Sequence, residues 1–154
     1  MELTIIKLNK LMAKEVSSLV KETFDNYVAK DYTKEGVKTY HNYISPEAML
    51  ERSNNGALIL VAIYNDSIAG MIEIINNNEI SLFYVDSKWQ KLGIGKELFI
   101  EAIRRVKNNH LDSLTVKASV FAEKVYSNLG FARTGEETVD NGMTVIPMIY
   151  RIGE

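Results

Sequence analysis

The sequence contains no cysteine, and this absence excludes a disulfide scaffold, thiolate catalysis and a zinc–thiolate site. With only two histidines, His41 and His110, a histidine-rich metal cage is disfavoured as well, so we expect no metal. No apolar stretch approaches transmembrane length, and the N-terminus lacks the charged and apolar regions of a signal peptide. We therefore expect a cytoplasmic protein with no membrane partner.

An excess of positive charge is also missing. The formal net charge is -2 and the lysines and arginines are dispersed along the chain, so we expect no nucleic-acid partner. Apolar residues make up 46% and charged residues 25% of the sequence, as in an ordinary globular protein. At 154 residues the chain, residues 1–154, is expected to form one domain with a substantial core.

Hydrophobic periodicity predicts the mixture of strands and helices that is typical of an α/β domain. Strands are expected over residues 3–8, 57–64, 68–75, 80–85, 114–118, 131–138 and 144–152. Helices are expected over residues 9–30, 37–44, 46–53, 94–106 and 121–129. A helical crossover should place the strands at 80–85 and 114–118 parallel to each other.

The last predicted strand carries a proline, Pro147, which cannot donate a hydrogen bond to a neighbouring strand. We therefore expect a bulge or a sheet edge there. Apolar side chains surround the proline and suggest an exposed apolar patch or edge: Val145, Ile146, Met148, Ile149 and Tyr150.

The most informative stretch is the turn between the strand at 80–85 and the next helix. It reads Gln90-Lys91-Leu92-Gly93-Ile94-Gly95. The first turn of a helix has free N–H groups and the positive end of the helix dipole, and glycine lets a ligand approach the backbone. The pattern predicts a diphosphate site. It is neither a Walker loop nor a dinucleotide-fold turn, whose third glycine position holds Leu98 here.

This turn resembles the acetyl-coenzyme A loop of the GCN5-related N-acetyltransferases (GNAT), Gln/Arg-x-x-Gly-x-Gly/Ala, which follows a strand ending in valine, here Val85. A second family motif is matched by Ala122, Tyr126 and Gly130-Phe131, with Ser119 where the family usually has asparagine. The resemblance covers nearly the whole chain. It implies a mixed, mostly antiparallel twisted sheet of about six to seven strands, flanked by about four helices, with a splayed parallel strand pair at the cofactor site.

The resemblance implies that acetyl-coenzyme A lies in the gap between the splayed strands. Free amides of the turn, together with Gln90 and two lysines, would bind its pyrophosphate, and the end of the preceding strand would pair with the pantetheine amides. For Lys91 and Lys96, a solvated helix end is the alternative. The predicted cofactor residues are Phe83, Tyr84, Val85, Gln90, Lys91, Leu92, Gly93, Ile94, Gly95, Lys96, Ser119 and Tyr126.

Acetyl transfer needs a proton donor for the leaving thiolate, a donor to the oxyanion and a means of deprotonating the amine. Tyr126 matches the family tyrosine that protonates the thiolate. A phenol pKa of about 10 in water allows it to donate without being lost as an anion. The alternative is that Tyr126 is only a core residue of its helix. The backbone N–H of Val85 or its neighbour would be the oxyanion donor.

The general base stays open among three candidates. Glu73 lies in mid-strand among apolar residues, either as a base or on the wet face of a half-covered sheet. Glu79 precedes the strand at 80–85, either as a base or as a solvated turn residue. His41 is the third, although a lone histidine is more often structural. Nearby aromatic residues line an acceptor pocket for an apolar or cationic amine, or pack as core: Phe24, Tyr27, Tyr32, Tyr40 and Tyr43.

The favoured function is that of an acetyl-coenzyme A-dependent N-acetyltransferase, which transfers an acetyl group by direct attack of a primary amine of a small molecule or peptide. Two other classes stay open. One is a non-catalytic acyl-coenzyme A-binding sensor or regulatory module, and the other is a nucleotide-binding domain of another kind. Members of the resembled family often dimerise through their last strands, so the apolar residues there predict a homodimer.

Overall fold

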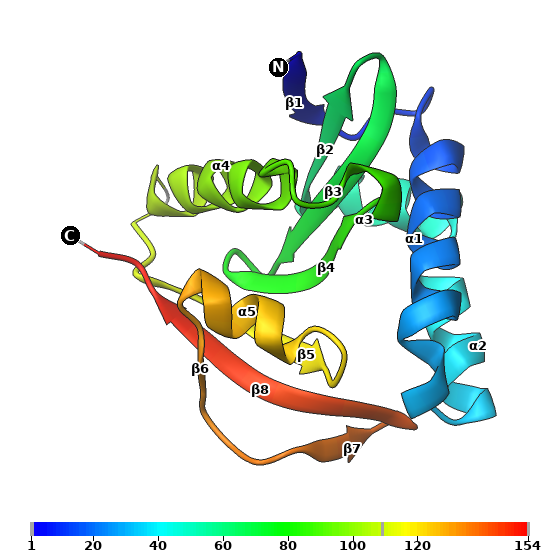
Figure 1. Cartoon of the computed structure of the whole chain (residues 1–154), viewed down its shortest axis with the longest axis vertical. Coiled ribbons are helices and arrows are strands. Elements are labelled where there is room, and N and C mark those ends of the chain that lie inside the picture. Colours follow the sequence, from blue (N-terminus) through cyan, green and yellow to red (C-terminus); the bar gives the residue numbers. More distant parts are fainter. Residues whose placement is uncertain (1, 109, 154) are drawn as a thin grey trace.

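A computed structural model describes residues 2–108 and 110–153 of the chain (Figure 1). The helices are α1 (Ala13–Tyr27), α2 (Lys34–Tyr43), α3 (Pro46–Asn54), α4 (Ile94–Asn108) and α5 (Glu123–Leu129), with short 3-10 turns η1 (Ala29–Asp31) and η2 (Ser87–Trp89). The strands are β1 (Leu3–Lys7), β2 (Leu58–Tyr64), β3 (Ser67–Ile75), β4 (Glu79–Val85), β5 (Ser113–Ser119), β6 (Ala132–Arg133), β7 (Thr138–Asp140) and β8 (Met143–Arg151).

The strands form one eight-stranded sheet in the order β1-β2-β3-β4-β5-β8-β6, and β7 also pairs with β8. Strands β1 to β4 form an antiparallel meander, and β5 is antiparallel to β8. Between these halves, β4 and β5 run parallel, as predicted for two strands linked by a helix. The predicted mixed, mostly antiparallel α/β fold is therefore confirmed.

Strand β2 explains why the meander is buried on both faces. Its residues from Ile59 to Ala62 are apolar and fully buried. Because successive side chains of a strand point to opposite faces, Leu60 and Ala62 join the cluster beneath α4, while Ile59 and Val61 join the cluster beneath α1 and α3. Helices therefore cover both faces of this half of the sheet, which agrees with the nearly continuous apolar run of β2 (Figure 1).

Helix α4 is amphipathic and packs on one face of the meander. Its buried side chains recur every three or four residues, at Ile94, Leu98, Ala102 and Val106. Burying one such large apolar side chain contributes about 1.5–3 kcal/mol. This face fixes the helix, and with it the glycine turn, against β3 and β4. Across the described residues, no helix combines the length and the apolar character that crossing a membrane requires.

Two turns hold the strands in register. Asn65 and Asp66 have φ of 49° and 65° between β2 and β3, the left-handed geometry that Asn and Asp tolerate best after glycine. Gly142, between β7 and β8, has φ of 79°, and a Cβ there would lie 2.2 Å from Thr33 Oγ1. The Thr33 N–H donates to the Gly142 carbonyl at 2.8 Å. The last hairpin is thereby attached to the loop before α2.

The helix starts follow local capping chemistry. Ser45 Oγ accepts from the Ala48 N–H at 3.1 Å, and Pro46 is the first residue of α3, as predicted. Asn9, where the first helix was expected to begin, instead accepts from the Leu11 and Met12 amides at 2.9 and 3.2 Å. It caps the turn that precedes α1, so the helix begins later than expected.

The prediction of a single strand over residues 131–138 is wrong. The structure divides it into β6 and β7, because the intervening residues Gly135, Glu136 and Glu137 are exposed and do not alternate. Pro147 of β8 lies opposite this break and accepts from the Thr134 N–H at 2.9 Å, but it has no N–H of its own to continue the pairing. The division yields one more strand than the six to seven expected.

The predicted edge and apolar patch around Pro147 are also wrong. Strand β8 lies between β5 and the β6–β7 segment, with an unbroken register against β5. Val145, Ile146 and Met148 are buried within the chain, with 7%, 1% and 2% of their surface exposed. The homodimer stays a prediction without the surface on which it was based.

Candidate functional site

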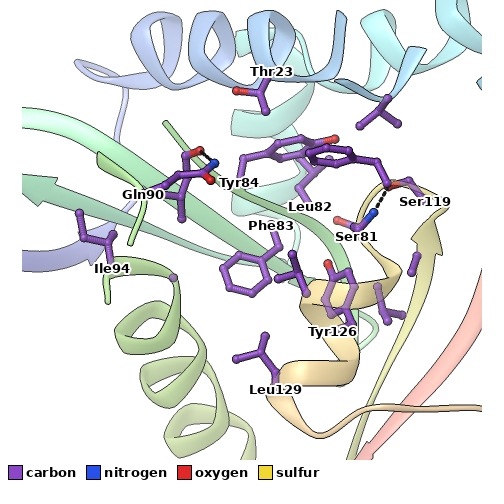
Figure 2. Close-up of a pocket in the computed structure, with 18 of the residues that line it drawn as sticks. Thr23, Ser81, Leu82, Phe83, Tyr84, Gln90, Ile94, Ser119, Tyr126 and Leu129 are labelled. Atoms are coloured by element: carbon purple, nitrogen blue, oxygen red, sulfur yellow. Dashed lines mark hydrogen bonds between the residues drawn. The ribbon is translucent and has the colours of Figure 1, made fainter. Parts of the chain in front are cut away.

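The candidate site opens where β4 and β5 separate. The register between these strands consists of the pairs Glu79–Thr115 and Ile80–Val116, after which the strands diverge. A cavity of about 360 Å³ fills the gap, a volume in the range of small-molecule sites. Its walls come from α1, β4, the start of α4, the end of β5 and α5 (Figure 2). The splayed parallel pair that the sequence predicted is therefore present.

The backbone of β4 faces this gap with alternate residues. The Asp86 N–H donates to the Ala69 carbonyl of β3 at 2.8 Å. Because neighbouring residues of a strand direct their N–H and C=O groups to opposite sides, Phe83 and Val85 direct theirs toward the gap. Tyr84 pairs with Met71 of β3 instead. Of the three residues predicted to pair with pantetheine, two therefore have backbone groups on the correct side.

One end of the cavity is formed by the turn before α4, which we call the glycine end (Val85–Lys96). Gly93 has φ of 82°, which L side chains rarely adopt. The first hydrogen bond of the helix runs from the Glu97 N–H to the Gly93 carbonyl at 3.0 Å. The three amides before Glu97 lie outside this ladder and are free to bind an anion. A Cβ on Gly95 would lie 3.4 Å from Val85 Cγ2, so glycine allows close approach there.

The side chains of the glycine end are distributed differently from the prediction. Gln90 Nε2 donates to the Val85 carbonyl at 3.2 Å, so it closes the turn onto the end of β4. Lys91 and Lys96 line the cavity. Leu92 is 43% exposed and does not belong to the cavity wall, so its backbone is its only contribution here.

Tyr126 lines the opposite wall and comes from α5. Ser119 Oγ, at the end of β5, accepts from the Ala122 N–H at 3.1 Å and so caps the turn that begins this helix. Gly130 ends the helix with φ of 109°, as predicted from its sequence position. These local signals hold α5 so that Tyr126 points into the cavity (Figure 2).

Burial controls the protonation of Tyr126. The residue is 6% exposed, and its ring packs edge-on against Phe131 at a centroid distance of 5.2 Å. Burial, and to a lesser degree the phenol of Tyr84, raises the pKa of Tyr126 well above its ordinary value. At neutral pH the hydroxyl keeps its proton and is available as a donor. Tyr126 therefore both packs in the core and lines the cavity.

The other end of the cavity, which we call the aromatic end, is formed by Thr23, Val28, Tyr32, Tyr40, Tyr84 and Phe121. The hydroxyls of Tyr40 and Tyr84 lie 2.6 Å apart and form a hydrogen bond between α2 and β4. Burial raises the pKa of both. Burial also raises the pKa of Tyr32 to about 12. The phenols of this wall are therefore neutral at physiological pH.

The early aromatic residues divide between wall and core. Tyr32 and Tyr40 line the cavity, whereas Phe24 is completely buried and stacks on Tyr40 at 4.0 Å. Tyr43 lies outside the cavity wall, with the Arg52 guanidinium 3.6 Å above its ring. Tyr27 stacks on Phe121 at 5.2 Å, which joins α1 to the loop before α5. Some of these aromatic residues therefore line the cavity, and others pack as core, so each of the two alternatives drawn from the sequence applies to part of the group.

Glu73 is neither on a wet face nor in the wall of the cavity. It is fully buried, and its carboxylate accepts from Arg52 Nε and Nη2 at 2.7 and 3.0 Å. Arg52 also donates to the Tyr43 carbonyl at 2.7 Å. A buried carboxylate is tolerated when an arginine pairs with both of its oxygens. Glu73 thus links β3 to α3.

The other base candidates also lie outside the wall. Glu79 is at the closed end of the β4–β5 pair, opposite Thr115. His41 Nε2 lies 2.6 Å from Asp25 Oδ1 on the outer side of α1 and α2. Among the described residues that line the cavity, none carries a carboxylate or an imidazole. Within residues 2–108 and 110–153, no group of three or more potential metal-ligating side chains is found.

The wall residues that were not predicted as site residues include Thr23, Val28, Lys117, Phe121 and Val125. Thr23 lies in α1, Val28 directly follows it, Lys117 is in β5, Phe121 precedes α5 and Val125 lies within α5. Phe121 and Val125 are the clearest examples of unpredicted wall residues, because they are large apolar residues whose side chains are 49% and 53% exposed. Sequence periodicity assigned both to the buried face of a helix.

Comparison with known proteins agrees with this geometry. A family model described as an acetyltransferase (GNAT) domain matches residues 28–152. A GCN5-related N-acetyltransferase from Rhodopseudomonas palustris is similar with a TM-score of 0.83 and 16% identity, over 97% of this chain and 95% of that chain. The PaiA N-acetyltransferase from Thermoplasma acidophilum, in complex with coenzyme A, gives 0.80 and 23%, over 98% and 99%.

An aminoglycoside 6'-N-acetyltransferase complexed with coenzyme A gives a TM-score of 0.73 and 15% identity, over 98% of each chain. Likenesses at these identities establish the shared fold. The family model covers most of the sequence and includes the glycine turn and α5. The resemblance inferred from the motifs is thus confirmed, and the chain belongs to the GNAT acetyltransferase family.

Proposed function

We propose that the protein is an acetyl-coenzyme A-dependent N-acetyltransferase in which a primary amine attacks the acetyl group directly. The observation that carries the proposal is the composition of one cavity. At one end are the free amides of a helix start, along one side is the unpaired edge of β4, and a buried neutral phenol lies opposite. These are the groups that a diphosphate, an extended amide-bearing chain and a leaving thiolate need.

The chain's residues fit the cosubstrate in order along the cavity. The amides of Ile94, Gly95 and Lys96 would bind the pyrophosphate, with Lys91 and Lys96 supplying positive charge. The backbone groups of Phe83 would pair with the pantetheine amides, and the Val85 N–H would stabilise an oxyanion. When bound, acetyl-coenzyme A supplies the activated acetyl thioester.

Tyr126 would donate its proton to the departing sulfur as the new C–N bond forms, and it would regain a proton from the amine nitrogen. The described wall has no carboxylate or imidazole, so we assign no protein base and do not place Glu73 or Glu79 in this role. The amine then has to enter as its uncharged free base. The rate constant kcat/KM should therefore rise with pH through the pKa of the amine.

The test is to incubate the protein with acetyl-coenzyme A and a panel of primary amines, and to follow the released thiol. Calorimetry measures coenzyme A binding separately. Thiol release that depends on an amine, with binding of coenzyme A, is the expected result. If coenzyme A does not bind to the folded protein, both the site and the function are refuted.

One observation favours the second candidate, a non-catalytic acyl-coenzyme A-binding module. It is the lack of a carboxylate or imidazole in the described wall, because a sensor needs no base. The same assay separates the two. Tight binding of acetyl-coenzyme A without thiol release, across amines that differ in pKa and size, would support the sensor.

A further inference from the structure

The aromatic end of the cavity opens to solvent through apolar side chains. Phe121 and Val125 both line the cavity and are 49% and 53% exposed. The ring of Tyr27, 39% exposed, lies nearly parallel to that of Phe121, with 5.2 Å between the centroids and 20° between the planes. Large apolar side chains at a cavity mouth mark a surface that a ligand or partner covers. Phe121 and Val125 come from the segment that carries Tyr126, whereas the glycine end is formed by Val85–Lys96.

The charges of the cavity have one sign. The charged side chains that line it are three lysines, Lys91 and Lys96 at the glycine end and Lys117 of β5. Lys117 Nζ lies 3.3 Å from Asp140 Oδ2, but Asp140 itself is outside the wall. A ligand with several positive charges would lose hydration here and would find no carboxylate among the described wall residues to replace it.

The polar groups of the aromatic end are few, namely the hydroxyls of Thr23 and of its three tyrosines, and most of them are engaged with one another or with the backbone. Tyr40 and Tyr84 share a hydrogen bond of 2.6 Å, and the Thr23 hydroxyl donates to the Leu19 carbonyl at 2.9 Å. The tyrosine pair has one remaining proton to donate and free lone pairs to accept. That capacity suits one uncharged amine nitrogen. A second or third amine, as an ammonium, would find no carboxylate partner in the described wall.

We infer that the acceptor is a monoamine with an apolar aryl or alkyl body, and that this body lies against Phe121 and Val125. The inference rests on the proposed function and specifies its substrate class. Amines with several positive charges, such as polyamines and aminoglycosides, are excluded as good substrates because the described wall offers them no carboxylate. The apolar mouth supplies the binding surface, and the tyrosine pair holds the single nitrogen.

The first experiment compares kcat/KM at pH 8, calculated for the uncharged fraction of each amine, for 2-phenylethylamine and hexylamine with that for ethylamine, spermidine and kanamycin. We expect the two amines with an apolar body to exceed each of the other three by about tenfold or more, because burial of the body adds favourable apolar contact. Thiol release that is as fast or faster with spermidine or kanamycin overturns the inference and leaves the proposed function standing. No release with any amine refutes the catalytic function itself.

Variants of the mouth provide the second measurement. Phe121→Ala should lower kcat/KM for 2-phenylethylamine by about tenfold and leave that for ethylamine within about twofold, because it removes an aromatic contact. Coenzyme A affinity should stay unchanged. Val120→Ala is the matched control, since Val120 precedes Phe121, is 39% exposed and does not line the cavity. An equal loss with both amines would mean that Phe121 only supports the fold.

A charge added to the mouth reverses the preference. Val125→Glu introduces a carboxylate at an exposed position of the wall, and it should raise kcat/KM for spermidine by about fivefold while lowering that for hexylamine, because a carboxylate attracts the second ammonium and disfavours an apolar chain. An unchanged ratio of the two rate constants in a folded variant that binds coenzyme A would contradict an acceptor at this mouth.

Discussion

The two ends of the cavity are built in different ways. The glycine end comes from one continuous segment, and its functional groups are backbone amides and carbonyls from Val85 to Lys96. The aromatic end is assembled from α1, α2, β4 and the loop before α5, and its functional groups are side chains. A site made of backbone groups recognises a chemical group that many ligands share. Side chains that come from separate elements can vary between proteins of the same fold, and with them the ligand that is bound.

Protonation also distinguishes the two ends. The glycine end has exposed lysines, while the aromatic end has phenols whose pKa values are raised by burial. Tyr126 lies between them, and its hydroxyl is close enough to the Tyr84 phenol for the two to influence each other. Because the two ends are built from different groups, we expect that substitutions can impair coenzyme A binding without changing the specificity for the amine, and the reverse. The predictions below test this, in decreasing order of effect on activity.

Tyr126→Phe, at the junction of the two ends, should have the largest effect. The substitution removes a proton donor and little volume, so kcat should fall by about ten- to a thousandfold, as for lost general acid catalysis. Affinity for acetyl-coenzyme A should barely change, because the bound cosubstrate does not need that proton. Pre-steady-state kinetics are required, since slow product release could hide the change.

Tyr150→Phe is the control for the loss of a hydroxyl. Its ring packs against Phe99 and Phe131 at 5.1 and 5.5 Å, beside Tyr126, yet it does not line the cavity. A chemical step at the wild-type rate in Tyr126→Phe would assign that residue to packing and favour the sensor.

Gly95→Val should damage the glycine end alone. A Cβ at this position would make ordinary contact with Val85 Cγ2 at 3.4 Å, so the fold should survive. The two added methyl groups would lie where the backbone must approach the pyrophosphate, and we expect the Kd of coenzyme A to rise about a hundredfold, or about 2.7 kcal/mol. Calorimetry provides the measurement and circular dichroism verifies folding.

Gly153→Val, with no atom within 4 Å of its added Cβ, is the matched control for Gly95→Val. Equal coenzyme A affinity in the two folded variants would remove the pyrophosphate from the glycine end.

Glu73→Gln should lower the stability of the protein without lowering its activity. The substitution breaks the pairing with Arg52 in a fully buried position, which should cost about 3 kcal/mol of unfolding free energy. At temperatures where the variant is folded, kcat should stay within about twofold, because Glu73 does not line the cavity. Urea denaturation and steady-state kinetics measure the two effects. A hundredfold loss of kcat in the folded variant would restore Glu73 as a base.

The last prediction concerns stability at high pH and depends on the phenols of the aromatic end. Burial raises the pKa of Tyr32 from 10.0 to about 12, and it raises those of Tyr40 and Tyr84 as well. A phenol in the unfolded chain ionises from about pH 10, while the folded one resists. The unfolding free energy should thus be constant up to pH 10 and then fall, by at most about 1.4 kcal/mol per pH unit for each phenol.

Urea denaturation between pH 9 and pH 11.5 measures this slope. Tyr40→Phe removes one titrating group and should make the slope shallower, whereas Gly95→Val should leave it unchanged. A slope that is identical in wild type and Tyr40→Phe would mean that Tyr40 ionises equally in both states.

The local features of the site were predictable because each depends on neighbouring residues. The glycine turn, the left-handed Gly130 and the cap at Ser45 all act within a few positions of themselves. The meander was predictable for the same reason, since short Asn-rich turns pair adjacent strands. Tyr126 reached the cavity because its helix is held between such signals.

Contacts between distant segments were not predictable. Arg52 and Glu73 are 21 positions apart, and an apolar strand gave no indication that a buried guanidinium would neutralise its carboxylate. The break between β6 and β7 depends on Pro147, which lies on another strand. The patch expected on β8 proved to be core, because strands on both sides and α5 enclose it.

The sequence by itself determined the family, the order of the elements and the position of the glycine turn and Tyr126, because period, capping and glycine act over a turn or two. Only the tertiary structure decided which aromatic residues line the cavity, that Glu73 is bound by Arg52, and that the described wall carries lysines without carboxylates. The physical reason is that the environment of a side chain depends on what packs against it, and those partners come from elsewhere in the chain.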